Sequence, residues 1–356
     1  MSDRLERCRR LLADRRLDAV IVSHPADVRY LSGFRGEDAM LLVGREAAMI
    51  CTDSRFWAQV HEEVRDFELV RTDVLLDDVA AAAAERFGDD AALGFQGGVL
   101  TYAGRRRLRR RHRGRLKDVG AAVGRLRQVK DDDEVAAIRR ACDAADAVLR
   151  AVAERGLVGR TEADVAWQIK EELHRLGAEG ESFPAIVAGG PNGALAHAIP
   201  GERRIGPGEL VVIDMGARVD GYCSDITRTF ATGDPDDELR RIYDVVLAAQ
   251  LAGLAAVAPG VTGREADAAA RDVIEAAGYG EHFGHGTGHG VGLEIHEEPR
   301  LSRRAAERLE PGMVVTVEPG IYLEGRAGVR IEDSVLVTVT GAEALTRFPK
   351  ELTVVG

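Results

Sequence analysis

The stretch PGELVVIDMG, residues 207–216, decides the fold because the chain nearly repeats it as PGMVVTVEPG at residues 311–320. The two Pro-Gly pairs are 104 residues apart, and so are the upstream motifs GRTEADVA, which begins at Gly159, and GREADAAA, which begins at Gly263. Each copy predicts a helix, a loop and a strand pair that a Pro-Gly turn introduces. We expect the two copies to face each other and to bury a shared sheet.

A two-residue hairpin signal, Asp220-Gly221, follows the first of these strands. A turn at this point pairs Val219 with Tyr222. Counting outward from that pair places Asp214 directly opposite Thr227. The register of this hairpin therefore predicts which side chains lie near the acid at the end of the first strand.

Four acids are expected to converge at the interface between the two copies. Asp225 shares a face with Asp214 on the predicted hairpin, on a diagonal of about 7–8 Å. Glu318 aligns with Asp214 in the repeat, and Glu332 points the same way as Arg330 on an alternating strand. Buried carboxylates are costly unless they are paired or bind metal. The pattern predicts a site for about two divalent ions, and oxygen-rich ligation favours manganese, cobalt or iron, with zinc possible.

The segment HGTGHGVGLEIHE, residues 285–297, concentrates histidine, glutamate and glycine. Its glycines predict a close approach of the backbone to a ligand. A phosphate-binding loop is a poor interpretation, because no Lys-Ser or Lys-Thr pair follows the glycines. The imidazoles are therefore candidates for the same site as the four acids.

The first 125 residues have a different pattern, in which five short apolar runs alternate with helical segments. This alternation predicts an α/β domain. A long amphipathic helix begins near Lys130, where three aspartates suit its first turn. We therefore expect an amino-terminal domain at residues 1–125 and a second domain at residues 126–356, in an α+β protein.

Composition limits the classes of function. The chain has 356 residues and a formal net charge of −11, which argues against general nucleic-acid binding. It contains no run of eighteen apolar residues and no apolar segment typical of a signal peptide, so we expect a cytoplasmic protein without membrane association. Four widely spaced cysteines without a CxxC motif favour reduced thiols.

One basic run departs from this acidic average. RRRLRRRHRGRLK, residues 105–117, has nine Lys or Arg residues in thirteen positions. The simplest interpretation is a solvated helix face or an oligomer contact. An anionic partner is the second interpretation.

At these motifs the sequence resembles the pita-bread metallopeptidases, the family of prolidase, aminopeptidase P, methionine aminopeptidase and the metal-free creatinase. The amino-terminal domain is similar to the creatinase-type domain, and residues 130–356 are similar to the catalytic domain with its pseudo-twofold repeat. The segment from His285 to Glu297 resembles the signature of the proline-specific branch. The resemblance implies that five residues bind two ions: Asp214, Asp225, His289, Glu318 and Glu332. It assigns Asp225 and Glu332 to the positions that bridge both ions.

The resemblance also implies roles for other histidines. His197 and His296 correspond to histidines that hold substrate or help to move protons. His285 is expected either to pack or to form hydrogen bonds behind the ligands. His282 is expected at the surface.

The implied reaction is amide hydrolysis by a hydroxide that bridges two metal ions. Glu318 is the expected proton carrier, and His197 and His296 steady the tetrahedral intermediate. Arg330 is expected to keep Glu332 ionised and oriented, with Thr227 in the same layer behind the ligands.

Arg300 carries the expectation about substrate length. An arginine at this place resembles one that some prolidases use for the free carboxylate of a dipeptide, although aminopeptidase P-like sequences also have it. A surface arginine paired with Glu297 or Glu298 is the simpler interpretation.

Two different functions also fit a chain of this resemblance. One is a metal-free creatinase-like hydrolase, and the other is a non-catalytic binding protein with a vestigial peptidase fold. The full set of acidic ligand positions favours the metallopeptidase over both. By family analogy, we expect a homodimer that acts on small peptides.

Overall fold

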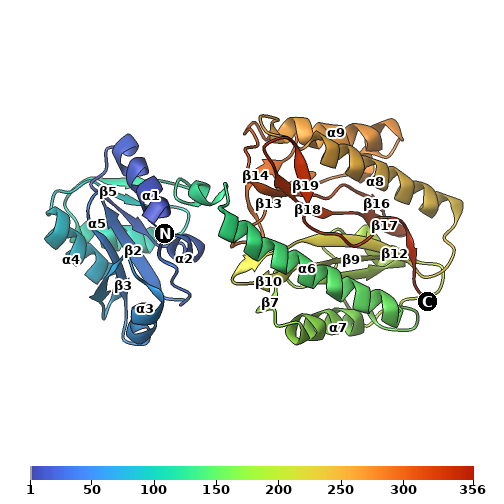
Figure 1. The fold of residues 1–356 in the computed structure, drawn as a ribbon, viewed down its shortest axis with the longest axis horizontal. Coiled ribbons are helices and arrows are strands. Elements are labelled where there is room, and N and C mark those ends of the chain that lie inside the picture. Colours follow the sequence, from blue (N-terminus) through green and yellow to red (C-terminus); the bar gives the residue numbers. More distant parts are fainter. Residues whose placement is uncertain (1) are drawn as a thin grey trace. The chain divides into compact units, whose positions relative to one another are not determined.

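The computed structural model describes residues 2–356 and divides the chain into two compact units (Figure 1). The first unit ends at Arg127 and the second runs from Gln128 to Gly356. The expected combination of an α/β domain with a larger α+β domain is confirmed by the elements within each unit. Within the described residues, no helix has the length and apolar character needed to span a membrane.

The first unit is built on one six-stranded sheet with the strand order β4-β3-β2-β1-β5-β6. All five apolar runs predicted in this region form strands. The strands are β1 (Ala19–Val22), β2 (Ala39–Gly44), β3 (Ala48–Thr52), β4 (Glu68–Arg71), β5 (Leu93–Phe95) and β6 (Leu116–Asp118). The helices are α1 (Ser2–Arg15), α2 (Pro25–Ser32), α3 (Trp57–Glu63), α4 (Leu75–Phe87) and α5 (Tyr102–Arg111), and a short 3-10 helix, η1, covers Gly124–Arg127.

The basic run at residues 105–117 is not one helix face. Its first part lies on α5, which ends at Arg111, and its last part forms the edge strand β6. Leu108 is fully buried against the sheet core, whereas most of the arginines around it are exposed. The charge therefore covers a helix, a loop and a strand edge.

The second unit places two helix pairs over two principal sheets. Figure 1 shows α6 and α7 along one side of this unit and α8 and α9 along the other. The helices are α6 (Asp132–Arg155), α7 (Glu162–Arg175), α8 (Asp237–Ala256) and α9 (Gly263–Ala276), with 3-10 helices η2 (Gly190–Ala194) and η3 (Gly280–His282). The predicted N-cap of α6 is present, because Asp131 and Glu134 form a reciprocal capping box.

The first principal sheet has the order β20-β12-β9-β8, and the second has the order β14-β13-β15-β18-β19. Their strands are β8 (Ile186–Gly189), β9 (Leu210–Met215), β12 (Ile226–Ala231), β13 (Gly288–Gly290), β14 (Glu297–Leu301), β15 (Val314–Val317), β18 (Asp333–Val337), β19 (Ala342–Ala344) and β20 (Thr353–Val354). Shorter strands are β7 (Gly180–Glu181), β10 (Ala217–Val219), β11 (Tyr222–Cys223), β16 (Gly320–Leu323) and β17 (Ala327–Arg330). The expected shared sheet is thus two sheets, which meet where Glu332 donates its backbone N–H to the carbonyl of Thr227 at 3.0 Å.

The repeat is real, but the helices and strands of the two copies have different offsets. β9 begins at Leu210 and β15 at Val314, which keeps the predicted spacing of 104 residues. The helix N-caps are Thr161 and Thr262, which are only 101 residues apart. In both copies the threonine that caps the helix precedes its capping acid by three positions, so Thr161 corresponds to Thr262. The alignment of GRTEADVA with GREADAAA, which uses an offset of 104, is therefore three residues out of register.

Candidate metal centre

A single cavity of about 570 Å³ gathers ten of the eleven residues singled out from the sequence. The ten are His197, Asp214, Asp225, His285, His289, His296, Arg300, Glu318, Arg330 and Glu332. The eleventh, Thr227, is fully buried directly behind them. Residues far apart in the chain therefore form one site in the second unit.

The hairpin register predicted from Asp220-Gly221 is confirmed. Val219 pairs with Tyr222, and Asp214 pairs with Thr227. Because side chains alternate along a strand, this register decides that Asp214 faces the cavity. Asp225 precedes β12 and lines the same cavity.

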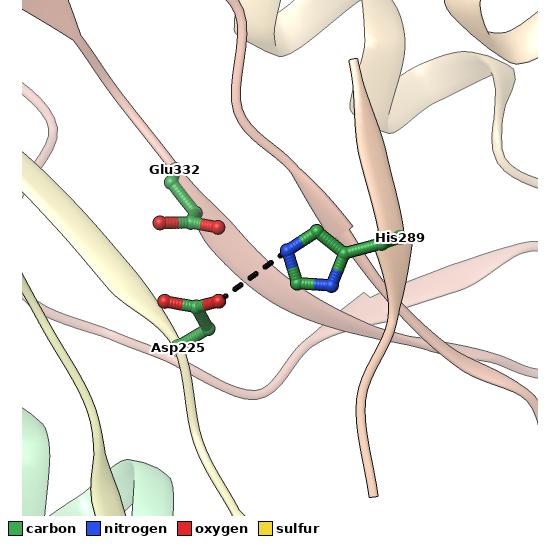
Figure 2. Close-up of side chains that lie close together, drawn as sticks. All are labelled: Asp225, His289 and Glu332. Atoms are coloured by element: carbon green, nitrogen blue, oxygen red, sulfur yellow. Dashed lines mark ion pairs between the residues drawn. The ribbon is translucent and has the colours of Figure 1, made fainter. Parts of the chain in front are cut away.

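Three of the acid and histidine side chains form a compact, buried cluster (Figure 2). Asp225, His289 and Glu332 each offer one ligand atom, and these atoms lie within 4.8 Å of one another. The His289 Nε2 atom is 3.6 Å from Asp225 Oδ2 and 3.4 Å from Glu318 Oε1. The imidazole therefore faces two carboxylates from different parts of the chain.

The hydrogen bonding of His289 fits metal ligation. Its Nδ1 lies 3.1 Å from the carbonyl oxygen of Gly290, so the proton of a neutral ring is placed on Nδ1. Burial lowers the pKa of His289 to about 3, so the ring is neutral at physiological pH. Its Nε2 then presents a lone pair toward carboxylate oxygens, an arrangement that is repulsive without a cation between them.

The carboxylates independently indicate that this site holds a cation. Burial and the neighbouring acids raise the pKa values of Asp225 and Glu332, and burial raises that of Glu318. The Oδ1 atoms of Asp214 and Asp225 are buried and have no hydrogen-bond partner among the described residues. Such unpaired buried oxygens are costly and suit a divalent ion. The residues present therefore fit a metal centre.

Arg330 orders the acids on one side of the cavity. It donates from Nη2 to Asp214 Oδ2 at 2.6 Å and from Nε to the Thr227 hydroxyl at 3.2 Å. The Thr227 hydroxyl in turn donates to Glu332 Oε2 at 2.7 Å. The direct carboxylate partner of Arg330 is thus Asp214 and not Glu332, which it reaches through Thr227.

Tyr322 is a site residue that the sequence reasoning missed. Its hydroxyl accepts a hydrogen bond from Arg330 Nη1 at 2.8 Å and lies 2.8 Å from His285 Nε2. His285 is therefore hydrogen-bonded through Tyr322 to Arg330, beside the acids of the cavity. The signal was available: a hairpin at Gly325 pairs Tyr322 with Gly328, which puts Tyr322 diagonally beside Arg330 on the same face.

Two family models match different parts of the chain. The model described as "Metallopeptidase family M24" matches residues 136–339, and "Creatinase/Prolidase N-terminal domain" matches residues 4–129. The chain belongs to metallopeptidase family M24. The predicted family, fold and metallopeptidase class are therefore confirmed.

Relatives of this M24 chain cover its whole length. An Xaa-Pro dipeptidase of Pyrococcus furiosus is 36% identical over 355 residues, 99% of this chain and 100% of its own. The structure of an Xaa-Pro dipeptidase from Bacillus anthracis has a TM-score of 0.96 at 39% identity and covers 99% of both chains. An X-Pro aminopeptidase structure from Thermotoga maritima has a TM-score of 0.90 at 33% identity and covers 99% of this chain and 100% of that one.

Two glycines of the His285–Glu297 segment also have a packing role. A Cβ atom on Gly288 would lie 1.9 Å from the carbonyl oxygen of Thr316, and one on Gly290 would lie 2.4 Å from that of Glu298. These oxygens belong to the segments on either side of β13. Glycine is thus required because the backbones pack too closely for a side chain, and this packing fixes His289 between the two segments.

The remaining histidines and Arg300 lie on the exposed side of the M24 cavity. His197 and His296 are exposed, and the His296 ring stands edge-on to that of His289 with 4.4 Å between centroids. Arg300 lines the cavity, and its Nε is 4.0 Å from Glu298 Oε1, the surface partner considered for it. His282 is exposed and does not line the cavity, as expected.

Proposed function

We propose that this M24 protein is an exopeptidase that hydrolyses the Xaa-Pro bond of dipeptides or short peptides, with two divalent ions at the buried end of the cavity. The proposal is supported by full-length relatives that carry the names Xaa-Pro dipeptidase and X-Pro aminopeptidase. The single observation that carries it is the buried cluster of Asp225, His289 and Glu332 beside two further acids.

The charge of the site favours two ions over one. Asp214, Asp225, Glu318 and Glu332 bring four negative charges, and Arg330 offsets one of them through Asp214. These groups together carry a charge of −3, so one divalent ion would leave a negative charge in a buried site, whereas two ions together with one hydroxide would bring the total to zero. Asp214, Asp225, His289, Glu318 and Glu332 would hold the ions, and manganese is the first candidate, ahead of cobalt, iron and zinc.

When bound, the ions would lower the pKa of water to give a hydroxide nucleophile near neutral pH and would polarise the scissile carbonyl. Glu318 is the proposed proton carrier. Its side chain is 17% exposed at the edge of the buried cluster, where a carboxylate can accept a proton from water and pass it to the leaving nitrogen. The Thr316 hydroxyl donates to Glu318 Oε1 at 3.3 Å and orients it.

His197 and His296 are proposed to bind the substrate and the developing oxyanion. Both rings line the cavity from its exposed side, where a peptide enters. Burial, Arg300 and His197 lower the pKa of His296, which keeps its ring neutral and able to donate one hydrogen bond. Neither histidine belongs to the proposed ligand set.

Arg300 is proposed to bind the free carboxylate of a dipeptide substrate. Its side chain is 46% exposed and its Glu298 contact is a long one at 4.0 Å, so the guanidinium can turn toward the cavity. A guanidinium fork holds a carboxylate in a bidentate manner. This residue gives a slight preference for dipeptidase over aminopeptidase activity.

Metal analysis combined with one substrate comparison tests the proposal. Purified protein is expected to contain two divalent ions per chain and to cleave Xaa-Pro dipeptides or Xaa-Pro-Yaa tripeptides in a chelator-sensitive manner. Full activity after exhaustive chelation would instead support a metal-free creatinase-like hydrolase. Bound metal without hydrolysis of any Xaa-Pro peptide would support a non-catalytic binding protein.

A further inference from the structure

The basic run of the first unit surrounds a hollow that the peptidase proposal does not use. This hollow has a volume of about 480 Å³ and is open to solvent. Among the described residues, its lining contains five arginines and no acidic side chain: Arg105, Arg106, Arg109, Arg113 and Arg115, with Tyr102, Gly114 and Leu116. A concave surface with a single sign of charge concentrates ions of the opposite sign.

The arginines of α5 fall into two groups with different partners. Arg107 and Arg111, four residues apart, both pair with Asp77 on α4 at 2.5 and 3.0 Å. Within residues 2–356, the arginines that line the hollow have no carboxylate partner of this kind. Asp77 therefore offsets part of the charge on one face of the helix, whereas the arginines on the other face have no carboxylate beside them in the described part of the chain.

Within the hollow, some guanidinium groups are structural and others are available. Arg109 donates to the carbonyl oxygen of Gly114 at 2.6 Å, which fixes the loop between α5 and β6. Arg106 lies over the Tyr102 ring, 5.9 Å from its centroid. The side chains of Arg105 and Arg113 are exposed and have no hydrogen-bond or ion-pair partner in the part of the chain that the structure describes.

The distribution of charge makes this arrangement unusual for the chain. Residues 1–127 contain half of the 48 Lys and Arg residues but only about a third of the 59 Asp and Glu residues. Some exposed arginines elsewhere in this unit, such as Arg35 and Arg55, pair with carboxylates. Other exposed arginines of this unit, such as Arg86 and Arg110, have no such partner among the described residues either, but this hollow gathers five arginines without an acidic side chain in its lining.

We propose that this hollow binds a compact, multiply charged phosphate, namely a triphosphate group that is either free or carried by a nucleoside. Guanidinium forks match phosphate oxygens in a bidentate manner, and Arg105 and Arg113 supply two such forks. The Tyr102 ring is 73% exposed although Arg106 lies over it, and it offers an aromatic face on which a base can stack. A long polyanion is disfavoured because the whole chain carries a charge of −11.

The test compares two double variants of the full-length holoenzyme that have the same net charge. Arg105→Gln with Arg113→Gln removes two forks from the hollow. Arg86→Gln with Arg110→Gln removes two exposed arginines that do not line it. Calorimetric titration with inorganic tripolyphosphate at about 0.15 M salt is the measurement. Metal content is measured in each sample, because chelation at the metal centre affects all three proteins equally and can be subtracted.

Saturable tripolyphosphate binding is expected in the parent protein, with an affinity loss of at least tenfold in the hollow variant and less than twofold in the control variant. If ATP binds as tightly as tripolyphosphate, the ligand of the hollow can be a nucleoside triphosphate. If ATP binds more weakly, the ligand is free triphosphate. Peptidase activity without added phosphate is expected to be unchanged in both variants. An equal loss in the two variants, or no saturable binding, overturns the proposal. Tighter binding of an oligonucleotide without a terminal phosphate also overturns it.

Discussion

The buried and exposed sides of the M24 cavity are built in different ways. On the buried side, Asp214, Asp225, His289 and Glu332 are all at most 9% exposed, and hydrogen bonds or close packing fix each one. On the exposed side, His197, His296 and Arg300 have few protein partners. Buried charges must be neutralised and held in place, whereas exposed groups remain free to turn toward a ligand. The difference separates residues that would hold metal from residues that would hold substrate.

The largest expected effect comes from the buried side. Asp225→Asn removes a proposed bridging carboxylate, so we expect the variant to lose metal. Without the metal the transition state loses several kcal/mol of stabilisation, and kcat should fall by about 10³-fold or more. Activity and metal content are measured on the same samples. Asp146→Asn is the control, because Asp146 is a buried acid that binds the backbone N–H groups of Arg347 and Phe348 outside the cavity. Retained turnover in Asp225→Asn would contradict the assignment.

The exposed histidines test whether the two sides differ in function. His296→Ala and His197→Ala are expected to keep both ions but to lose turnover by about 10²–10³-fold, because each removes a donor to the substrate or transition state. His282→Ala, which changes an exposed histidine outside the cavity, is the matched control. Loss of metal from His296→Ala would show that His296 helps to hold the ions and does not act on the substrate alone.

Tyr322 tests the layer that supports the buried side. Tyr322→Phe removes the hydroxyl that joins His285 to Arg330, and we expect kcat to fall about 10–100-fold with little change in KM. Tyr243→Phe removes a hydroxyl bonded to the carbonyl of Lys350 and serves as the control for simple loss of a hydrogen bond. If the two variants lose the same amount of stability but only Tyr322→Phe loses kcat, Tyr322 positions the groups of the cavity. A change in KM alone would contradict it.

The pH dependence of stability tests the same layer. Burial lowers the pKa of His285 to about 4, so its neutral form is favoured in the folded chain. In the unfolded chain His285 takes up a proton near its ordinary pKa of about 6.5, whereas in the folded chain it does so only near pH 4. The stabilisation that comes from the neutral His285 ring is therefore present above about pH 6.5 and is lost as the pH falls toward 4. Between pH 7 and pH 5, the free energy of unfolding should fall by about 2 kcal/mol more in the parent than in His285→Gln. Identical pH profiles in urea unfolding would show that His285 is not held neutral.

The smallest effect is expected from Arg300. Arg300→Ala should raise KM for Xaa-Pro dipeptides about tenfold, as the loss of one charge-assisted contact suggests, and should leave Xaa-Pro-Yaa tripeptides almost unchanged. Arg303→Ala is the control, because Arg303 is exposed and pairs with Glu275. Steady-state kinetics on both substrate lengths decide the matter. Equal effects on both would return Arg300 to a surface role beside Glu298.

The sequence determined the strand register around the first acid of the site. The Asp220-Gly221 turn set the strand register, and period-two alternation then placed Asp214 opposite Thr227 and turned it toward the cavity. The spacing of 104 residues between β9 and β15 likewise predicted that Asp214 and Glu318 occupy equivalent places. Such inferences succeed because each turn fixes the residues that immediately follow it.

Only the tertiary structure decided which distant groups are partners. Arg330 pairs with Asp214, 116 positions away in the chain, and Tyr322 joins it to His285. These choices depend on burial, where an unsatisfied polar group is costly and the nearest complementary group satisfies it.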